Sequence, residues 1–214
     1  GAATISGNTS EVKAALVTSG SKITASKAVV TITDTTGTLA ATDLSAIGAT
    51  TSGTVTMTGA AKISGNTSEV KAALVETDSL VVTDETTSVS ISNASSVADL
   101  NLIAAKVADG QLTGSVASTA LTDLSSLNTH ATDIITVAVS DTTGTLAATD
   151  ISALGAKTAG TVTMAGAATI SGSTAQVTDA LVTSGSKIVA SKAVVKITDT
   201  TGTLAATDLS AIGA

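Results

Sequence analysis

The chain repeats itself over long stretches. Residues 166–214 match residues 1–49 at 42 of 49 positions, at an offset of 165. Residues 59–74 resemble residues 1–16 at an offset of 58, and the segment DTTGTLAATD recurs from Asp34 and from Asp141, at an offset of 107. Fixed offsets of this kind are the signature of a repeat architecture, in which each repeat needs its neighbours to bury its apolar face.

A two-residue motif, an acid or amide followed by a branched aliphatic residue, marks each repeat. The spacing between successive motifs ranges from 24 to 32, so the offsets of 58, 107 and 165 correspond to two, four and six repeats. We therefore predict about eight coils of about 27 residues in one continuous array over residues 1–214. We interpret the chain as a segment of a longer repeat protein. The motif begins at Glu11, Asp43, Glu69, Asp99, Asp123, Asp150, Gln176 and Asp208.

One type of repeat predicts two short strands followed by a helix. Residues 54–58 (TVTMT) alternate polar and apolar side chains, which indicates a half-buried strand with Val55 and Met57 facing inward. Residues 62–64 predict a second strand. Asn66 and Glu69 have the spacing of a capping box and predict the start of a helix.

The alternate type of repeat has a different turn. A strand over residues 29–33 leads into Asp34–Gly37 (DTTG), which predicts a turn because Asp bonds nearby backbone and Gly tolerates positive φ. We predict a helix over residues 39–49, capped by Thr38. Further helices are predicted over residues 97–107 and 119–127.

These elements predict an α/β or mainly β fold, a right-handed solenoid of stacked parallel short strands with one short helix per coil. The composition favours the same fold, since the chain has no Phe, Tyr, Trp, Pro or Cys. Stacked equivalent side chains leave a narrow interior that suits Ala, Val, Ile and Leu better than rings. Proline is disfavoured because it cannot donate a hydrogen bond in a central strand.

The charge of the chain disfavours two classes of partner. The net charge is −7, the pI is about 4.4, and all ten basic residues are lysines. Nucleic-acid binding depends on basic residues that neutralise phosphates, and anionic membrane surfaces attract basic segments. No apolar run approaches the roughly 18 residues that span a bilayer. We expect no nucleic-acid partner and no membrane insertion.

Calcium is the candidate cofactor that the acidic residues suggest. Asp34, Asp141 and Asp199 open the DTTG motifs, and calcium binds carboxylate oxygens. The alternative interpretation is that these aspartates only form turns. The acids of the two-residue motif raise the same choice, between a calcium ladder and acids that favour helix N-termini. Gln176 interrupts that column.

Outward-facing threonine pairs resemble the arrays of ice-binding solenoids. The ordinary interpretation is that β-branched residues occupy the exposed face of a strand. Lys196 replaces Thr31 in the second copy, which would interrupt an ice-binding lattice. The pairs are Thr31 and Thr33, Thr54 and Thr56, and Thr161 and Thr163.

Catalytic signals are sparse. His130 is the only histidine, and a zinc site would need further His or Cys ligands. No serine is marked as the nucleophile of a hydrolase triad with His130. Carbohydrate-cleaving β-helices use carboxylates clustered with basic residues and aromatic platforms, whereas this chain has neither Arg nor aromatic residues. We expect no enzymatic activity and no catalytic residue.

The pattern of a strand followed by DTTG and TLAATD(L/I)SA(I/L)G recurs through residues 33–48, 140–155 and 198–213. It resembles tandem segments of very large secreted or cell-surface repeat proteins of bacteria, cyanobacteria among them. The resemblance implies a secreted or cell-surface location and a structural or adhesive role, and it carries no catalytic residue over. We expect a rigid rod or fibre segment of a surface layer, matrix or filament that self-associates end to end or laterally. The alternatives are a calcium-dependent adhesin module and an ice-binding solenoid.

Overall fold

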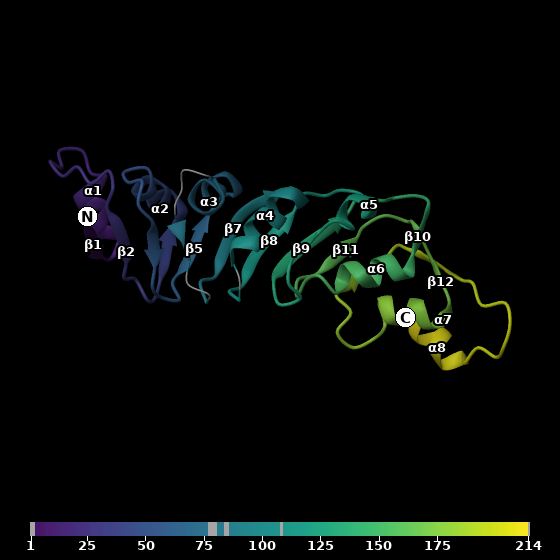
Figure 1. The fold of residues 1–214 in the computed structure, drawn as a ribbon. Helices are drawn as coiled ribbons and strands as arrows, with labels where there is room; N and C mark the ends of the chain where they lie inside the picture. The colour runs from purple at the N-terminus through teal and green to yellow at the C-terminus, as the bar shows by residue number, and fades with distance from the viewer. Residues whose placement is uncertain (1–2, 77–80, 84–85, 108, 214) are drawn as a thin grey trace. The chain divides into compact units, whose positions relative to one another are not determined.

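The structure is a computed structural model that describes residues 3–76, 81–83, 86–107 and 109–213 (Figure 1). It is a mixed α/β fold in which the paired strands are parallel, as the sequence predicted. The chain divides into two compact units. Unit 1 holds residues 1–95 and 101–114, and unit 2 holds residues 96–100 and 115–214. Helix α4 (Val97–Val107) and strand β8 (Leu112–Val116) contribute residues to both.

Unit 1 contains two parallel sheets and a set of short helices. One sheet has the order β1-β2-β4-β6, and β5 pairs with β3 and β7 in the other. Helix α2 packs beside α3, as Figure 1 shows. The elements are β1 (Thr4–Gly7), α1 (Thr9–Leu16), β2 (Val29–Ile32), β3 (Thr38–Ala40), α2 (Ala41–Gly48), β4 (Val55–Met57), β5 (Lys62–Gly65), α3 (Thr67–Leu74), β6 (Val81–Val82) and β7 (Val89–Ser95).

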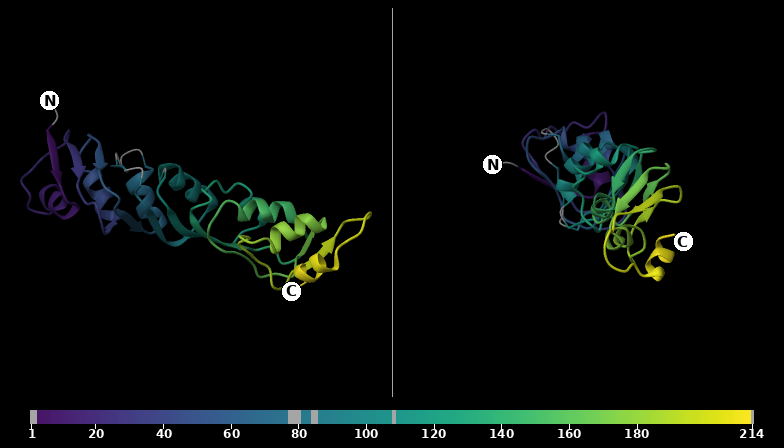
Figure 2. Two further views of the ribbon diagram at one scale, coloured as in Figure 1. Left: turned by 90° about the horizontal axis from the view of Figure 1, so that it is seen from below. Right: turned by 90° about the vertical axis from the view of Figure 1, so that its right-hand side faces the viewer.

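Unit 2 has the same components. Strand β11 pairs with β9 and β13, and β12 pairs with β10 and β14. Helices α6 and α7 lie side by side, as the views in Figure 2 show. The elements are α5 (Leu121–Leu124), β9 (Ile134–Val139), β10 (Thr145–Ala147), α6 (Ala148–Gly155), β11 (Val162–Met164), β12 (Thr169–Gly172), α7 (Thr174–Leu181), β13 (Ile188–Val189), β14 (Val194–Ile197) and α8 (Ala206–Ile212).

Equivalent sequences pair in the same register in the two units. β2 places Val30 opposite Val55 of β4, and β9 places Val137 opposite Val162 of β11, so the numbers of both partners rise by 107. The pairs β4–β6 and β3–β5 recur as β11–β13 and β10–β12 at this offset. The pair β1–β2 recurs as β12–β14 at an offset of 165. These pairs of near-duplicate strands therefore keep the same register.

Rows of small branched side chains form the core of each sheet. Val30, Val55 and Val81 lie opposite one another on β2, β4 and β6, and each is at most 9% exposed. Two residues further along the same strands, Ile32 lies opposite Met57 and forms the next buried row. The alternation in residues 54–58 is thus confirmed. A ring in such a row would press against the equivalent side chain of the next strand, which accounts for the absence of aromatic residues.

Two predicted helices begin later than the sequence suggested. Thr38 does not cap a helix, because it lies in β3 opposite Lys62 of β5, and the N-cap of α2 is Ala40 without a side-chain hydrogen bond. Pairing with a neighbouring strand here outweighs local capping preference. The helix expected over residues 119–127 is reduced to α5, since Thr119 forms a β-bridge with Val139. The helix over residues 97–107 is confirmed as α4.

Candidate functional site

The DTTG aspartates lie at the N-termini of helices from the preceding repeat. Asp34 Oδ2 accepts hydrogen bonds from the backbone N and the hydroxyl of Thr9, the first residue of α1, both at 2.6 Å. Asp141 Oδ2 accepts from the backbone N of Leu121, the first residue of α5, at 2.7 Å. The first N–H groups of a helix lack partners within the helix, so each carboxylate satisfies one of them from about 20 to 25 residues away.

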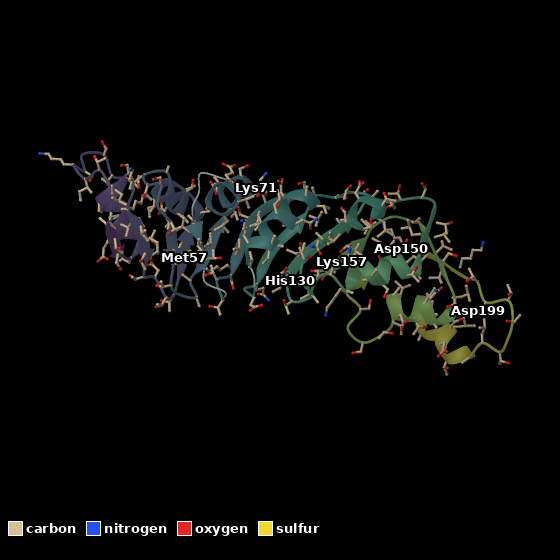
Figure 3. All side chains as sticks on the ribbon, in the orientation of Figure 1. Met57, Lys71, His130, Asp150, Lys157 and Asp199 are labelled. Carbon is tan, nitrogen blue, oxygen red and sulfur yellow. The ribbon has the colours of Figure 1, made fainter. Side chains whose placement is uncertain are left out.

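Asp199 makes the same contact in unit 2 (labelled in Figure 3). Its Oδ2 accepts from the backbone N of Thr174 at 2.6 Å and from the hydroxyl of Thr174 at 2.8 Å. The hydrogen bond from the backbone of Thr174, and then the one from its hydroxyl, hold the pKa of Asp199 below its ordinary value of 3.8. In this structure the three aspartates thus accept hydrogen bonds from the first N–H groups of helices α1, α5 and α7.

The lowered pKa of Asp199 predicts a dependence of stability on acid. A carboxyl whose pKa is lower in the folded than in the unfolded state stabilises fully above its unfolded pKa, and the contribution is lost as the pH falls through the folded pKa. Asp199→Asn keeps a carbonyl acceptor without the titration. We expect the melting temperature, followed by circular dichroism, to fall less for this variant than for the wild type between about pH 5 and pH 2. Equal falls would contradict the assignment.

Asn93 occupies the equivalent position beside α3. Its Oδ1 accepts from the backbone N of Thr67 at 2.8 Å and from the hydroxyl of Thr67 at 2.9 Å. The sequence did not reveal this residue, because the DTTG motif is absent around it. An amide oxygen therefore makes the same pair of contacts as the carboxylates do.

This substitution within the chain predicts the behaviour of Asp34 variants. Asp34→Ala removes the acceptor for Thr9 and is expected to lower the free energy of unfolding by about 1 kcal/mol, the usual cost of losing a helix cap. Asp34→Asn should retain most of that stability, as Asn93 does beside α3. Urea denaturation of both variants measures the difference. Equal losses in the two variants would indicate that the charge, and not the acceptor, matters.

The acids of the two-residue motif lie in the first turns of helices. Glu11 and Glu69 close capping boxes with Asn8 and Asn66, the N-caps of α1 and α3. The other acids of the column lie in the first turns of α2, α4, α5, α6 and α8, where a negative charge interacts favourably with the helix dipole. Within the residues that the structure describes, no group of three or more His, Cys, Asp or Glu side chains could hold a metal ion.

Chelation provides a direct test of the calcium alternative. Since the DTTG carboxylates already accept hydrogen bonds from helix N-termini, we expect EDTA to leave the melting temperature within about 1 °C of its value in calcium. A rise of several degrees with millimolar calcium would overturn this assignment and favour the adhesin alternative.

His130 lies in a turn with Asp133. The backbone N of His130 donates to Asp133 Oδ2 at 2.8 Å, and Nδ1 of the exposed ring lies 3.8 Å from the same oxygen. Asp133 is 1% exposed, so its carboxylate is fixed by the turn. Figure 3 shows His130 away from Asp150, the acid in the groove between α5 and α6. The arrangement is that of a turn-stabilising aspartate.

The threonine pairs form only a short row. In unit 1, Ser6, Thr31 and Thr56 lie opposite one another on β1, β2 and β4, and Val82 of β6 follows them. In unit 2, Thr163 is flanked by Ala138 and Val189. The row of hydroxyl side chains around Thr56 therefore does not recur around Thr163, its counterpart in unit 2.

A groove of about 390 Å³ opens between α5 and α6. Since α5 has 4 residues and α6 has 8, α5 leaves part of α6 uncovered on the side opposite α7 in the order of packing. Lys157 Nζ, labelled in Figure 3, donates to the backbone O of Ser125 at 2.6 Å across the groove. Leu121 and Leu154 form apolar walls, and Asp150 is the acidic group in the lining. The charged groups in the lining are thus one carboxylate and one ammonium, which already donates a hydrogen bond to a backbone oxygen.

Thr158 carries a buried hydroxyl that the sequence did not predict. Thr158 is 2% exposed, and its Oγ1 accepts from the backbone N of Ile135 at 2.9 Å and of Gly160 at 2.8 Å. It also donates to the O of Ile135 at 2.7 Å. Thr51, its counterpart in unit 1, bonds the backbone N of Gly53 in the same way. The signal that could have revealed both is a Thr two residues before the Gly that precedes TVTM.

The chain was compared with protein-family models, with curated proteins and with solved structures. No match was found in any of the three comparisons. Within the described residues, no helix is both long and apolar enough to cross a membrane.

Proposed function

We propose that this chain is a structural repeat protein, a solenoid of stacked strand–helix coils that forms a rigid segment of a bacterial surface layer, matrix or filament outside the cell. The observation that carries the proposal is the reuse of the same strand registers by equivalent sequences of the two units. When equivalent sequences stack identically, one repeat can follow another without limit, and length becomes the property under selection.

The contacts between repeats support a load-bearing role. Asp34, Asp141 and Asp199 each tie their own repeat to the helix of the preceding one. The sheets are held by parallel pairing between strands from successive repeats, and the rows of Val, Ile, Leu and Met fill the space between them. Such repeats give stiffness, and the hydrogen bonds of the strands and helices protect the backbone in these elements from proteases.

A deletion in phase with the repeat tests the solenoid. Removing residues 50–156 joins Ala49 to Lys157 and places β11, β12 and α7 where β4, β5 and α3 stand. We expect a folded protein with a cooperative melt and, by small-angle scattering, about half the maximum dimension. Removing residues 50–144 instead is out of phase, and we expect this control to unfold. An in-phase variant that fails to fold while the out-of-phase variant folds would contradict the solenoid.

The cellular role needs a separate measurement. Gold-labelled antibodies against the chain, viewed by electron microscopy on native cells, should decorate a surface layer, matrix or filament. Labelling confined to the cell interior would overturn the extracellular role and leave the solenoid untouched.

A further inference from the structure

One face of unit 2 is less covered than the equivalent face of unit 1. Three positions in β10 and α6 are each more exposed than their counterparts 107 residues earlier in β3 and α2. All three line the groove between α5 and α6, which has a volume of about 390 Å³. The groove thus marks a face that unit 1 covers. The pairs are buried Leu39 and half-buried Leu146, half-buried Asp43 and exposed Asp150, and half-buried Ala46 and exposed Ala153.

Helix α1 covers this face in unit 1. It packs against α2, and the ammonium of Lys13 forms an ion pair with the carboxylate of Asp43. Helix α5 occupies the place of α1 in unit 2, because Thr9 of α1 and Leu121 of α5 each donate a backbone hydrogen bond to a DTTG aspartate. Since α1 has 8 residues and α5 has 4, the second half of α1, which holds Lys13 and Leu16, has no helical counterpart in the described part of unit 2.

The shorter helix reflects a shorter stretch of chain. The chain advances by 21 residues from Thr9 to Val30 of β2, but by 16 from Leu121 to Val137 of β9, the counterpart of Val30. The difference is more than one helical turn. The groove that results is lined by residues between 121 and 157, well inside the sequence.

The groove has a carboxylate at one end of α6 and an ammonium beyond the other (Figure 3). Asp150 lies in the first turn of α6, and no described side chain donates to its carboxylate or forms an ion pair with it. Ser125 stands where α1 has Lys13, so α5 brings no cation to Asp150. Lys157 donates to the backbone O of Ser125 at 2.6 Å. A further cation is therefore favoured beside Asp150 and disfavoured beside Lys157.

We propose that this groove binds a short helix of a partner protein whose first turn carries a lysine and, three residues later, a leucine-sized apolar side chain. The lysine pairs with Asp150, and the apolar side chain lies against Leu121 and Leu154. Lys13 and Leu16 of α1 have this spacing, share one side of the helix and are both half-buried. The lysine lies in the first turn because α5 already fills the place of the first half of α1. This interaction does not depend on the structural role proposed above.

A synthetic helix supplies the probe. It is an acetylated, fluorescein-labelled peptide that begins with KAAL, the sequence of residues 13–16 and 71–74, and continues with AAQAAAQ as a helical support. Fluorescence anisotropy measures its binding to the whole chain. We expect saturable binding with a Kd below about 1 mM. A peptide of the same composition that begins with LAAK places its cation toward Lys157 and should bind more weakly.

Substitutions of Asp150 test the ion pair. Asp150→Asn should weaken binding of the KAAL peptide about threefold, the size expected for a partly exposed pair. Asp43→Asn is the matched control and should bind the peptide as the wild type does, because α1 covers that face. Asp150→Lys should reverse the preference and bind a peptide that begins with EAAL more tightly than the KAAL peptide. A purely structural role of Asp150 would not produce that reversal.

A chimera fills the groove from within the chain. Replacing residues 121–136 by residues 9–29 supplies the whole of α1 with its own loop, and binding of the KAAL peptide should be lost while the circular dichroism spectrum shows a folded protein. Undetectable binding to the wild type, binding that the folded chimera retains, or equal binding of the KAAL and LAAK peptides would overturn the proposal.

A competition experiment distinguishes a partner protein from a second copy of the chain. The Asp150→Lys chain lacks the groove carboxylate but still carries KAAL in α1 and α3. In excess, it should leave the labelled peptide bound to the wild type. Displacement of the peptide would show that a helix of a second copy is the occupant and would overturn the assignment to a partner protein.

Discussion

Gly160→Ala is expected to lower the free energy of unfolding by about 3 kcal/mol or more. A Cβ at this position would lie 2.3 Å from the carbonyl O and 2.5 Å from the carbonyl C of Ile135. The obstacle is the backbone of the neighbouring strand, which is itself fixed by hydrogen bonds to Thr158, so no rotamer change relieves it. Urea denaturation followed by circular dichroism measures the loss.

Gly144→Ala is the control. Gly144 has a φ of +89°, and no atom lies within 4 Å of the position a Cβ would take. Alanine there meets only the cost of a left-handed conformation, about 1–2 kcal/mol. Both substitutions change the unfolded chain in the same way. If the two variants lose equal stability, close packing of the strands is not what requires glycine at position 160.

Leu44→Ala and Leu209→Ala form a matched pair in nearly identical sequence. Leu44 is 0% exposed, so truncation should cost about 3 kcal/mol through lost burial and the cavity left behind. Leu209 is 40% exposed, and the same truncation should cost less than about 1 kcal/mol in the monomer. The measurement is urea denaturation followed by circular dichroism. Equal costs for the two leucines in the monomer would show that burial in α2 contributes less than its contacts suggest.

Local signals in the sequence predicted the elements whose determinants are local. The alternation around Val55 and Met57 fixed the faces of β4, and Asn66 with Glu69 marked the start of α3. Both patterns act within a few residues, so they hold wherever the segment lies.

Other features depend on a partner one repeat away. Thr38 has a good capping side chain, yet it lies in β3 because β5 offers it a strand to pair with. The bond from Thr9 to Asp34 spans 25 residues, and the sequence alone could assign Asp34 to a turn or to a metal. The third TLA segment shows the same dependence, since Thr203–Ala205 keeps the sequence of β3 without forming a strand. The repeated sequence therefore predicted which segments are structurally equivalent. Whether a given copy forms a strand depends on the strand or helix that lies next to it.

The contact between Asp34 and Thr9 sets the order in which the chain folds during synthesis. The ribosome releases α1 before it releases the aspartate that completes the N-terminus of that helix. The N-terminus of each helix of this type is thus completed only after about 25 further residues have been synthesised. Growth of the folded part then follows translation from the first repeat onward, and the last helix made is always the least secured.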